Sequence, residues 1–282
     1  MFWFEPFTVD RVRRYADEGV DILLPLGPGY YWMFRAAYEL KTEILEYLLQ
    51  KGRKPNEILS HSGTALWWVA NSQRSKGDKV KAAALLLRYG ADPNFATELE
   101  GGPLHAMHYK GDADMATYLI HHGARTEAVD GSGQTPLYKG MATLRHYRND
   151  DGFARAGRND AVIKALIRGG CDPLNPGPAK ATPLHIAAFL GRTDLVELML
   201  QHAPYREVRN GDVQTPLHVA ALTGSNAEMV RLLLSAGADP NVLDAYGERP
   251  LEIALRKNYL ELVSVLLPAT CSQLILPWLR TP

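Results

Sequence analysis

The chain has 282 residues, of which 46% are hydrophobic and 22% are charged, the balance of an ordinary soluble globular protein. Lys and Arg together number 31 and Asp and Glu also number 31, and this neutrality argues against a nucleic-acid-binding protein, which usually carries a basic surplus. The two cysteines, Cys171 and Cys271, form neither a disulfide framework nor a zinc motif and favour a reducing compartment.

The first ten residues are apolar, but Glu5 and Asp10 interrupt them and no basic segment precedes them, so we expect no signal peptide. No stretch approaches the roughly 18 apolar residues of a membrane span. We therefore expect a protein of the cytoplasm, the nucleus or both, without membrane association.

Two segments in the second half of the chain repeat each other. They are TPLHIAAFLGRTDLVELMLQHA from Thr182 and TPLHVAALTGSNAEMVRLLLSAGADPN from Thr215, which begin 33 residues apart. This motif resembles that of the ankyrin repeat family, and its recurrence covers about nine-tenths of the chain. The resemblance implies an all-α fold, an ankyrin-repeat α-solenoid of about seven helix-turn-helix repeats with short hairpin loops.

In chain order, residues 1–28 are predicted to form an N-terminal cap, in which 12–22 resembles a degenerate half-repeat. Residues 29–267 are predicted to form the repeats, beginning near 29, 62, 100, 133, 180, 213 and 247, and residues 268–282 a C-terminal tail. In each repeat Thr caps the first helix, Pro follows at its first position and paired alanines allow close helix packing. One such unit cannot bury its own apolar face, so the repeats must stack.

Two inserts interrupt the 33-residue period, near 71–78 in repeat two and near 142–157 in repeat four. Both are expected to lengthen the turn between the inner and outer helices. Both are basic, with Arg74, Lys76, Lys79 and Lys81 in or beside the first and Arg145, Arg148, Arg155 and Arg158 in or beside the second. Arg and Lys pair with carboxylates and phosphates, so the inserts are a candidate site for an anion or an acidic peptide; the alternative is a solvated loop.

Aromatic residues gather in repeats one to four, since most Phe, Trp and Tyr residues precede residue 148. The resemblance implies that the inner helices line a concave face, where we expect one position per repeat to point outward: Arg35, Trp68, Ala106, Lys139, Ile186, Val219 and Ile253. The candidate binding residues are Tyr31, Trp32, Arg35, Tyr38, Trp67, Trp68, His108, Tyr109, Tyr138 and Lys139, with Arg145 and Arg148 of the second insert. Exposed aromatic rings suit a binding hot spot, but a single ring can equally pack between repeats.

No strong catalytic signature is present: the sequence lacks GxSxG, HExxH, a phosphate loop and a dinucleotide fingerprint. If the chain were an enzyme, acid–base chemistry on an apolar substrate would fall to His108, Tyr109, Tyr138, Lys139 and His146. The resemblance implies a structural role for the motif histidines His105, His185 and His218. The NDDG at 149–152 fails as a calcium loop because positions one and twelve would be Tyr147 and Arg158, so we expect no metal and no cofactor.

The leading hypothesis is a monomeric, non-catalytic intracellular scaffold or adaptor. It would recognise another protein through the aromatic-rich concave face of repeats one to four. The alternatives are a binder of a small apolar molecule, or an enzyme, using the same groove, and a binder of an anion or acidic peptide at the basic inserts.

Overall fold

The computed structural model describes residues 7–22, 28–58, 63–72, 76–97, 100–107, 112–146 and 153–275. Within these ranges the chain forms α-helices joined by loops, with a 3-10 helix and an isolated β-bridge between Thr97 and Gly101. The all-α fold class is thereby confirmed. None of the helices in these described ranges has the length and apolarity that a membrane span requires.

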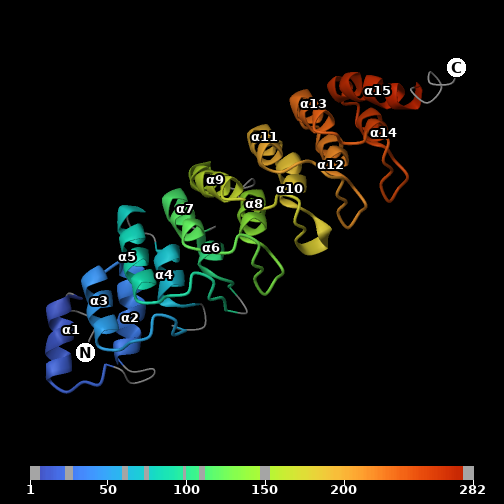
Figure 1. The fold of residues 1–282 in the computed structure, drawn as a ribbon. Coiled ribbons are helices and arrows are strands. Elements are labelled where there is room, and N and C mark those ends of the chain that lie inside the picture. The colour runs from blue at the N-terminus through green and yellow to red at the C-terminus, as the bar shows by residue number, and fades with distance from the viewer. Residues whose placement is uncertain are drawn as a thin grey trace. The chain divides into compact units, whose positions relative to one another are not determined.

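The chain divides into two compact units, and the first comprises Met1–Ser132 and Ala154–Ala165. One row of this unit is formed by α2, α4 and α6, and the other by α1, α3, α5 and α7, as Figure 1 shows. The helices are α1 (Val9–Asp17), α2 (Pro28–Glu39), α3 (Thr42–Gln50), α4 (Ala65–Asn71), α5 (Lys76–Arg88), α6 (Pro103–Ala106) and α7 (Ala113–His121). Each inner helix from α2 onward packs against the outer helix that follows it, which is the predicted helix pair.

The second unit comprises Gly133–Phe153 and Leu166–Pro282, and it has the same two-row arrangement. Its inner row is α8, α10, α12 and α14, and α11, α13 and α15 pack side by side in its outer row (Figure 1). The elements are α8 (Pro136–His146), the 3-10 helix η4 (Pro178–Lys180), α10 (Pro183–Leu190), α11 (Thr193–His202), α12 (Pro216–Thr223), α13 (Ala227–Ser235), α14 (Pro250–Arg256) and α15 (Leu260–Ile275). Helix α9 (Phe153–Arg168) contributes residues to both units.

Repeat six shows how the sequence specifies one helix pair. The Thr215 hydroxyl accepts a hydrogen bond from the His218 backbone N–H at 3.4 Å, and proline occupies the first position of α12. Gly224 ends α12 with a φ of 69°, and the Tyr259 ring lies within 3.0 Å of where a Cβ would be. A side chain there would therefore be both strained and obstructed. The paired alanines, Ala220 and Ala221, are fully buried, as expected for close helix packing.

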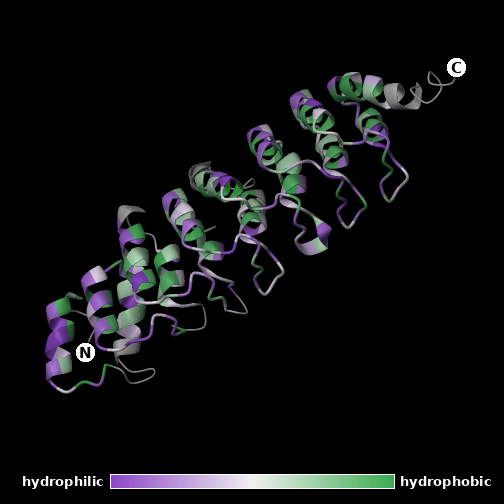
Figure 2. Ribbon diagram, in the orientation of Figure 1, coloured by the Kyte–Doolittle hydropathy of each residue, from purple (hydrophilic) through white to green (hydrophobic). Residues whose placement is uncertain are grey.

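The core of each unit lies between its helix rows. Leu66 and Leu86 are fully buried in the first unit, and Leu217 and Leu233 are fully buried in the second. Figure 2 shows hydrophobic residues concentrated on the helices and hydrophilic residues prominent on the hairpin loops of the second unit. Because each pair leaves an apolar face that only a neighbour covers, stacking supplies much of the stability.

Both inserts lie between the inner and outer helices of their repeats, but they contribute helix as well as turn. Helix α4 ends at Asn71 and α5 begins at Lys76, so the first insert supplies the start of α5. The second insert lengthens α8 as far as His146 and the 16-residue α9 from Phe153, while residues 147–152 lie outside the described residues. At the C-terminal side α15 continues to Ile275, past the boundary placed at 267.

Candidate protein-binding surface

Helices α2 and α4 present four aromatic rings of the first unit, which we call the aromatic surface: Tyr31, Phe34, Tyr38 and Trp68. The three residues of α2 are spaced i, i+3 and i+7, so they share one face of that helix. Trp68 joins them from α4, the neighbouring inner helix. The fold thus brings together rings that are 30 or more residues apart in the sequence.

The rings of the aromatic surface hold one another in place. The Trp68 ring centroid is 4.5 Å from that of Phe34 and 6.0 Å from that of Tyr38, at interplanar angles of 88° and 80°. Tyr31 lies 6.2 Å from Phe34, and Phe34 lies 6.4 Å from Tyr38. Edge-to-face pairs at such distances contribute about 0.5–1.5 kcal/mol each beyond the area they bury. The surface is therefore preorganised.

The exposure of these rings differs from that of the two tryptophans beside them. Tyr31 is 37% exposed and Phe34, Tyr38 and Trp68 are half-buried, whereas Trp32 and Trp67 are buried at 8% and 3%. Trp32 stacks on Tyr15 of α1 at 5.8 Å, so it fastens the N-terminal helix. Trp32 and Trp67 therefore offer little area to a partner.

Trp67 stands where the repeat motif has histidine, and it cannot do what that histidine does. In repeat five the imidazole of His185 contacts the Gln214 carbonyl oxygen at 2.9 Å, which ties one hairpin to the next. The Trp67 indole Nε1 is buried and has no hydrogen-bond partner among the described residues, which is a cost that its packing must offset. Part of that packing is a T-shaped contact with Trp68 at 4.9 Å.

A charged pair borders the rings. The guanidinium of Arg35 donates to the Glu39 carboxylate at 2.7 Å and lies over the Phe7 ring, 4.5 Å from its centroid. Both side chains are more than two-thirds buried. The charge of Arg35 is thus compensated locally.

The other predicted residues fall into two groups. Tyr138, in the second unit, is 8% exposed; its ring lies against Gly177 and its hydroxyl donates to the Pro178 carbonyl oxygen at 3.4 Å. Lys139 is half-buried on α8. His108, Tyr109 and Arg148 lie outside the described residues, and so do the side chains of Arg145 and His146 at the end of α8. The acid–base constellation proposed from the sequence therefore cannot be assembled from described side chains.

The expectation that one position per repeat points outward is wrong for most repeats. Ala106, Ile186, Val219 and Ile253 are between 1% and 7% exposed, because neighbouring inner helices cover them. Only where the side chain is long, as at Arg35, Trp68 and Lys139, does part of it reach the surface. Sequence reasoning also missed Phe34, although it occupies the position of the motif histidine in repeat one, as Trp67 does in repeat two.

The basic first insert is only partly a solvent-facing loop. Lys79 is 2% exposed; its ammonium lies 3.9 Å from the Asp112 carboxylate and 3.4 Å from the Ala70 carbonyl oxygen. Lys81 is exposed and lies 3.8 Å from the Asp78 carboxylate. Lys79 therefore holds the turn before α7 and is not available to an acidic partner.

A cavity of about 440 Å³ opens on the outer row of the first unit, away from the aromatic surface. It lies between α3 and α5 and is lined by Thr42, Glu46, Lys81, Ala84, Leu85 and Arg88. The Arg88 guanidinium pairs with Glu46 at 2.6 Å across it. This cavity is therefore not the small-molecule groove that was expected on the inner helices.

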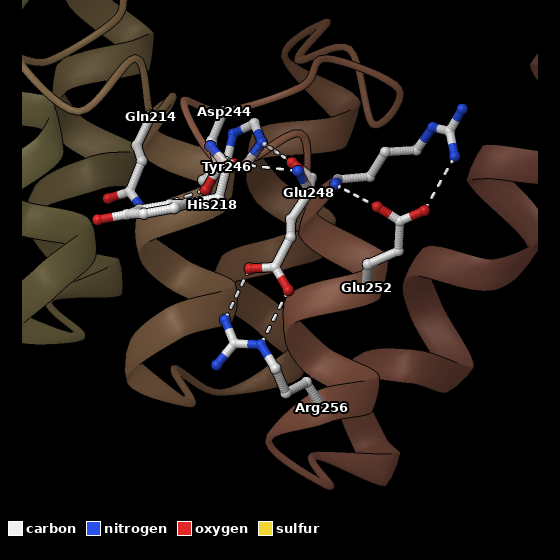
Figure 3. A network of polar contacts seen from close by, with 8 residues as sticks. Gln214, His218, Asp244, Tyr246, Glu248, Glu252 and Arg256 are labelled. Carbon is white, nitrogen blue, oxygen red and sulfur yellow. Dashed lines mark hydrogen bonds and ion pairs between the residues drawn. The ribbon is translucent and has the colours of Figure 1, made fainter.

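The structural role implied for the motif histidines is confirmed in the second unit. His218 contacts the Glu248 carbonyl oxygen at 3.1 Å, while the Asp244 carboxylate accepts the backbone N–H groups of Tyr246 and Glu248 at 2.9 and 3.0 Å (Figure 3). Burial lowers the pKa of His218, and it lowers the pKa of His185 to about 4. Both imidazoles are therefore neutral at pH 7, and each links its helix to the following hairpin through a hydrogen bond.

Comparisons with known proteins agree with the stacked helix-pair architecture. A family model described as "Ankyrin repeats (3 copies)" matches residues 153–244 and 204–274. The human ankyrin repeat and SOCS box protein 16 is 27% identical over 279 residues, covering 94% of this chain and 57% of that protein. The E3 ubiquitin-protein ligase KEG of Arabidopsis thaliana is 26% identical over 241 residues, covering 80% of this chain and 14% of that protein.

Among solved structures, the ankyrin repeat domain of human ASB11 matches with a TM-score of 0.61 and 23% identity, covering 84% of this chain and 96% of that one. At this identity the likeness concerns the fold. The chain spans less than two-thirds of the length of both curated relatives named above.

Proposed function

This chain belongs to the ankyrin repeat family, whose repeats serve as scaffolds for protein–protein binding, and on that premise we propose that it recognises a partner protein through the aromatic surface. The site would be the exposed parts of Tyr31, Phe34, Tyr38 and Trp68 on α2 and α4. Trp32, Trp67 and the Arg35–Glu39 pair would hold these rings in position.

One observation carries the proposal: the repeats of the second unit stack without an aromatic residue at the position that α4 fills with Trp68. In the second unit, the register of Trp68 is taken by Ile186 and Val219, which are 5% and 7% exposed. The register of Phe34 is taken by His185 and His218 in repeats five and six, and by the buried Tyr138 in repeat four. The ring cluster is therefore not a requirement of repeat packing, and its half-exposed rings are available for recognition.

The energetics of interfaces support the same conclusion. Binding hot spots are enriched in Trp and Tyr, which bury a large area at a small cost in side-chain entropy. The edge-to-face contacts of Trp68 fix Phe34 and Tyr38 before a partner arrives. Binding of a partner would therefore lose little side-chain entropy at this surface.

The test is affinity capture with matched variants of the full chain. Tyr38→Ala and Trp68→Ala each remove one ring, and Tyr246→Ala is the control because that ring is 79% exposed on a hairpin of the second unit. We expect a protein captured by the wild type to remain with Tyr246→Ala and to be lost with the two other variants. Calorimetry with the purified partner should show a loss of about 2 kcal/mol, roughly thirtyfold in Kd.

Circular dichroism establishes whether each variant keeps the helical fold, so that lost capture is not lost folding. Equal capture by all four proteins would refute the proposal. So would a loss that Tyr246→Ala shares, because that ring lies outside the aromatic surface.

A further inference from the structure

Phe7 is held on the same face of α2 as the aromatic surface. Its side chain is 8% exposed, and the Arg35 guanidinium lies over its ring, 4.5 Å from the centroid. Arg35 stands four residues after Tyr31 and three before Tyr38, so these three side chains are neighbours on one face of the helix. The chain at Phe7 therefore lies beside the rings of the aromatic surface.

The residues before Phe7 are rich in aromatic side chains. Helix α1 begins at Val9, where the Thr8 hydroxyl caps it by accepting the Arg11 backbone N–H at 3.4 Å, so Phe7 precedes the helix. Residues 1–6, which we call the N-terminal segment, lie outside the described residues. Glu5 is the one charged side chain of this segment, and three of its six residues are aromatic: Phe2, Trp3 and Phe4. Such a segment gains free energy when an apolar surface removes its rings from water.

The position of Phe7 puts the aromatic surface within reach of the N-terminal segment. An extended chain spans about 3.3–3.6 Å per residue, so Trp3, four residues before Phe7, has a reach of about 13–14 Å. Along α2, no ring of the surface is more than four residues, or about 6 Å, from Arg35. The Trp68 ring of α4 is close to them, with its centroid 4.5 Å from that of Phe34. Because the connection is short, the effective concentration of the segment at the rings is about millimolar.

We propose that the N-terminal segment is an intramolecular occupant of the aromatic surface, where its three aromatic side chains contact the rings of α2 and α4 and a partner protein must displace them. Tyr31 is 37% exposed, so the surface has ring area for the segment to cover. This inference rests on the proposed function, because it names a competitor for the same site. Removing the rings of the segment should tighten partner binding about fivefold, as expected if the segment covers the surface about four-fifths of the time.

The first test is photocrosslinking within the purified full chain. A benzophenone-bearing phenylalanine analogue replaces Trp3, and the irradiated protein is digested and analysed by mass spectrometry. We expect crosslinks from position 3 to α2 and α4 of the same chain, with a yield that falls about threefold when Tyr38→Ala is present. The control carries the analogue in place of Tyr246, which is 79% exposed in the second unit, and should give no crosslink to α2 or α4.

The second test is fluorine NMR of the chain labelled with fluorotryptophan. The chain has five tryptophans, and the Trp68 resonance is identified by its loss in Trp68→Phe. Replacing the three aromatic residues of the N-terminal segment by serine should shift the Trp68 resonance, because the rings packed against it are removed. Glu5→Gln changes the same segment but keeps its rings, and it should leave the resonance in place. Circular dichroism of each variant shows whether the helical fold is kept.

The inference is overturned if position 3 gives no crosslink to α2 or α4, or if the Trp68 resonance does not move in the serine variant. Crosslinks that join two chains also overturn it, because the occupant would then be a second copy. The proposed function is judged separately by capture. If these tests fail but capture is still lost with Trp68→Ala, the surface binds a partner without an internal competitor. If crosslinks form but capture does not depend on the rings, the proposed function fails and the rings hold only the N-terminal segment.

Discussion

The buried ion pair between Lys79 and Asp112 allows the sharpest test of how the first insert is used. Lys79→Met removes the charge but keeps an apolar side chain of similar length, and Asp112→Asn removes the other charge. Asparagine still supplies an oxygen at the position of Asp112 Oδ1, which accepts the Met115 backbone N–H at 3.1 Å and caps α7. The two side chains are 3% and 1% exposed, so neither charge has water to replace its partner.

The size of the expected loss in stability follows from the distance between the two charges and from their burial. Two unit charges 3.9 Å apart attract by about 4 kcal/mol at an effective dielectric constant of 20. Asp112 Oδ2 accepts no hydrogen bond from any described residue, and its distance from the Lys79 ammonium is at the upper limit for an ion pair. Removing one partner leaves the other as a buried charge without this counter-charge, and we expect each single substitution to lower the free energy of unfolding by about 3–5 kcal/mol. The double variant should lose less than about 2 kcal/mol, because no buried charge remains.

The assay is urea unfolding followed by circular dichroism for the wild type, the two single variants and the double variant. The control is Lys81→Met on the same helix, whose side chain is 76% exposed and whose pair with Asp78 is at the surface; we expect little change. If the double variant loses as much as the two single variants together, the two residues are independent and the reasoning is refuted.

Three further predictions concern the second unit. Burial lowers the pKa of His185 to about 4 from its ordinary 6.5, so the unfolded chain takes up the proton first as the pH falls. The free energy of unfolding should therefore fall by up to about 3 kcal/mol as pH drops from 6.5 to 4. An unfolding midpoint that does not decrease over this range would contradict the prediction. Gly177→Ala places a Cβ 2.5 Å from the Tyr138 ring, so it should destabilise by about 1–3 kcal/mol, and Tyr138→Ala in the same chain should recover part of that loss in thermal melts. Ala221→Leu should cost about 1–3 kcal/mol by overpacking a fully buried site, whereas Leu255→Ala at the equivalent position of the last repeat, where the side chain is 55% exposed, should change the melting temperature little.

The repeat architecture could be predicted because its signals are local and recur. The Thr caps, the left-handed glycines and the paired alanines each act within a few residues, as Thr215, Gly224 and Ala220 show. The 33-residue repetition then indicated the position of helices whose own sequence gives only a weak helix signal, such as the four-residue α6. The position of the inserts followed from the same register.

The details of the candidate site depend on which neighbour covers each side chain, and a repeat motif does not contain that information. The sequence shows adjacent tryptophans, but only the packing of α2 against α4 decides that Trp68 is half-exposed and Trp67 is 3% exposed. In the same way, the sequence does not distinguish Lys79 from the other basic residues of the insert. Only the fold places it beside Asp112, which is 33 residues further along the chain. Phe34 was missed because no single position of the motif marks it as a surface residue.

Recognition of a partner through the aromatic surface is tested most directly by site-specific photocrosslinking. A benzophenone-bearing phenylalanine analogue replaces Tyr31, which is 37% exposed, or Tyr246, which is 79% exposed and outside the surface. We expect a partner adduct from position 31 that disappears when Trp68→Ala is present, and no such adduct from position 246. An adduct of the same partner from position 246 alone, or one from position 31 that survives Trp68→Ala unchanged, would contradict the assignment of the binding surface.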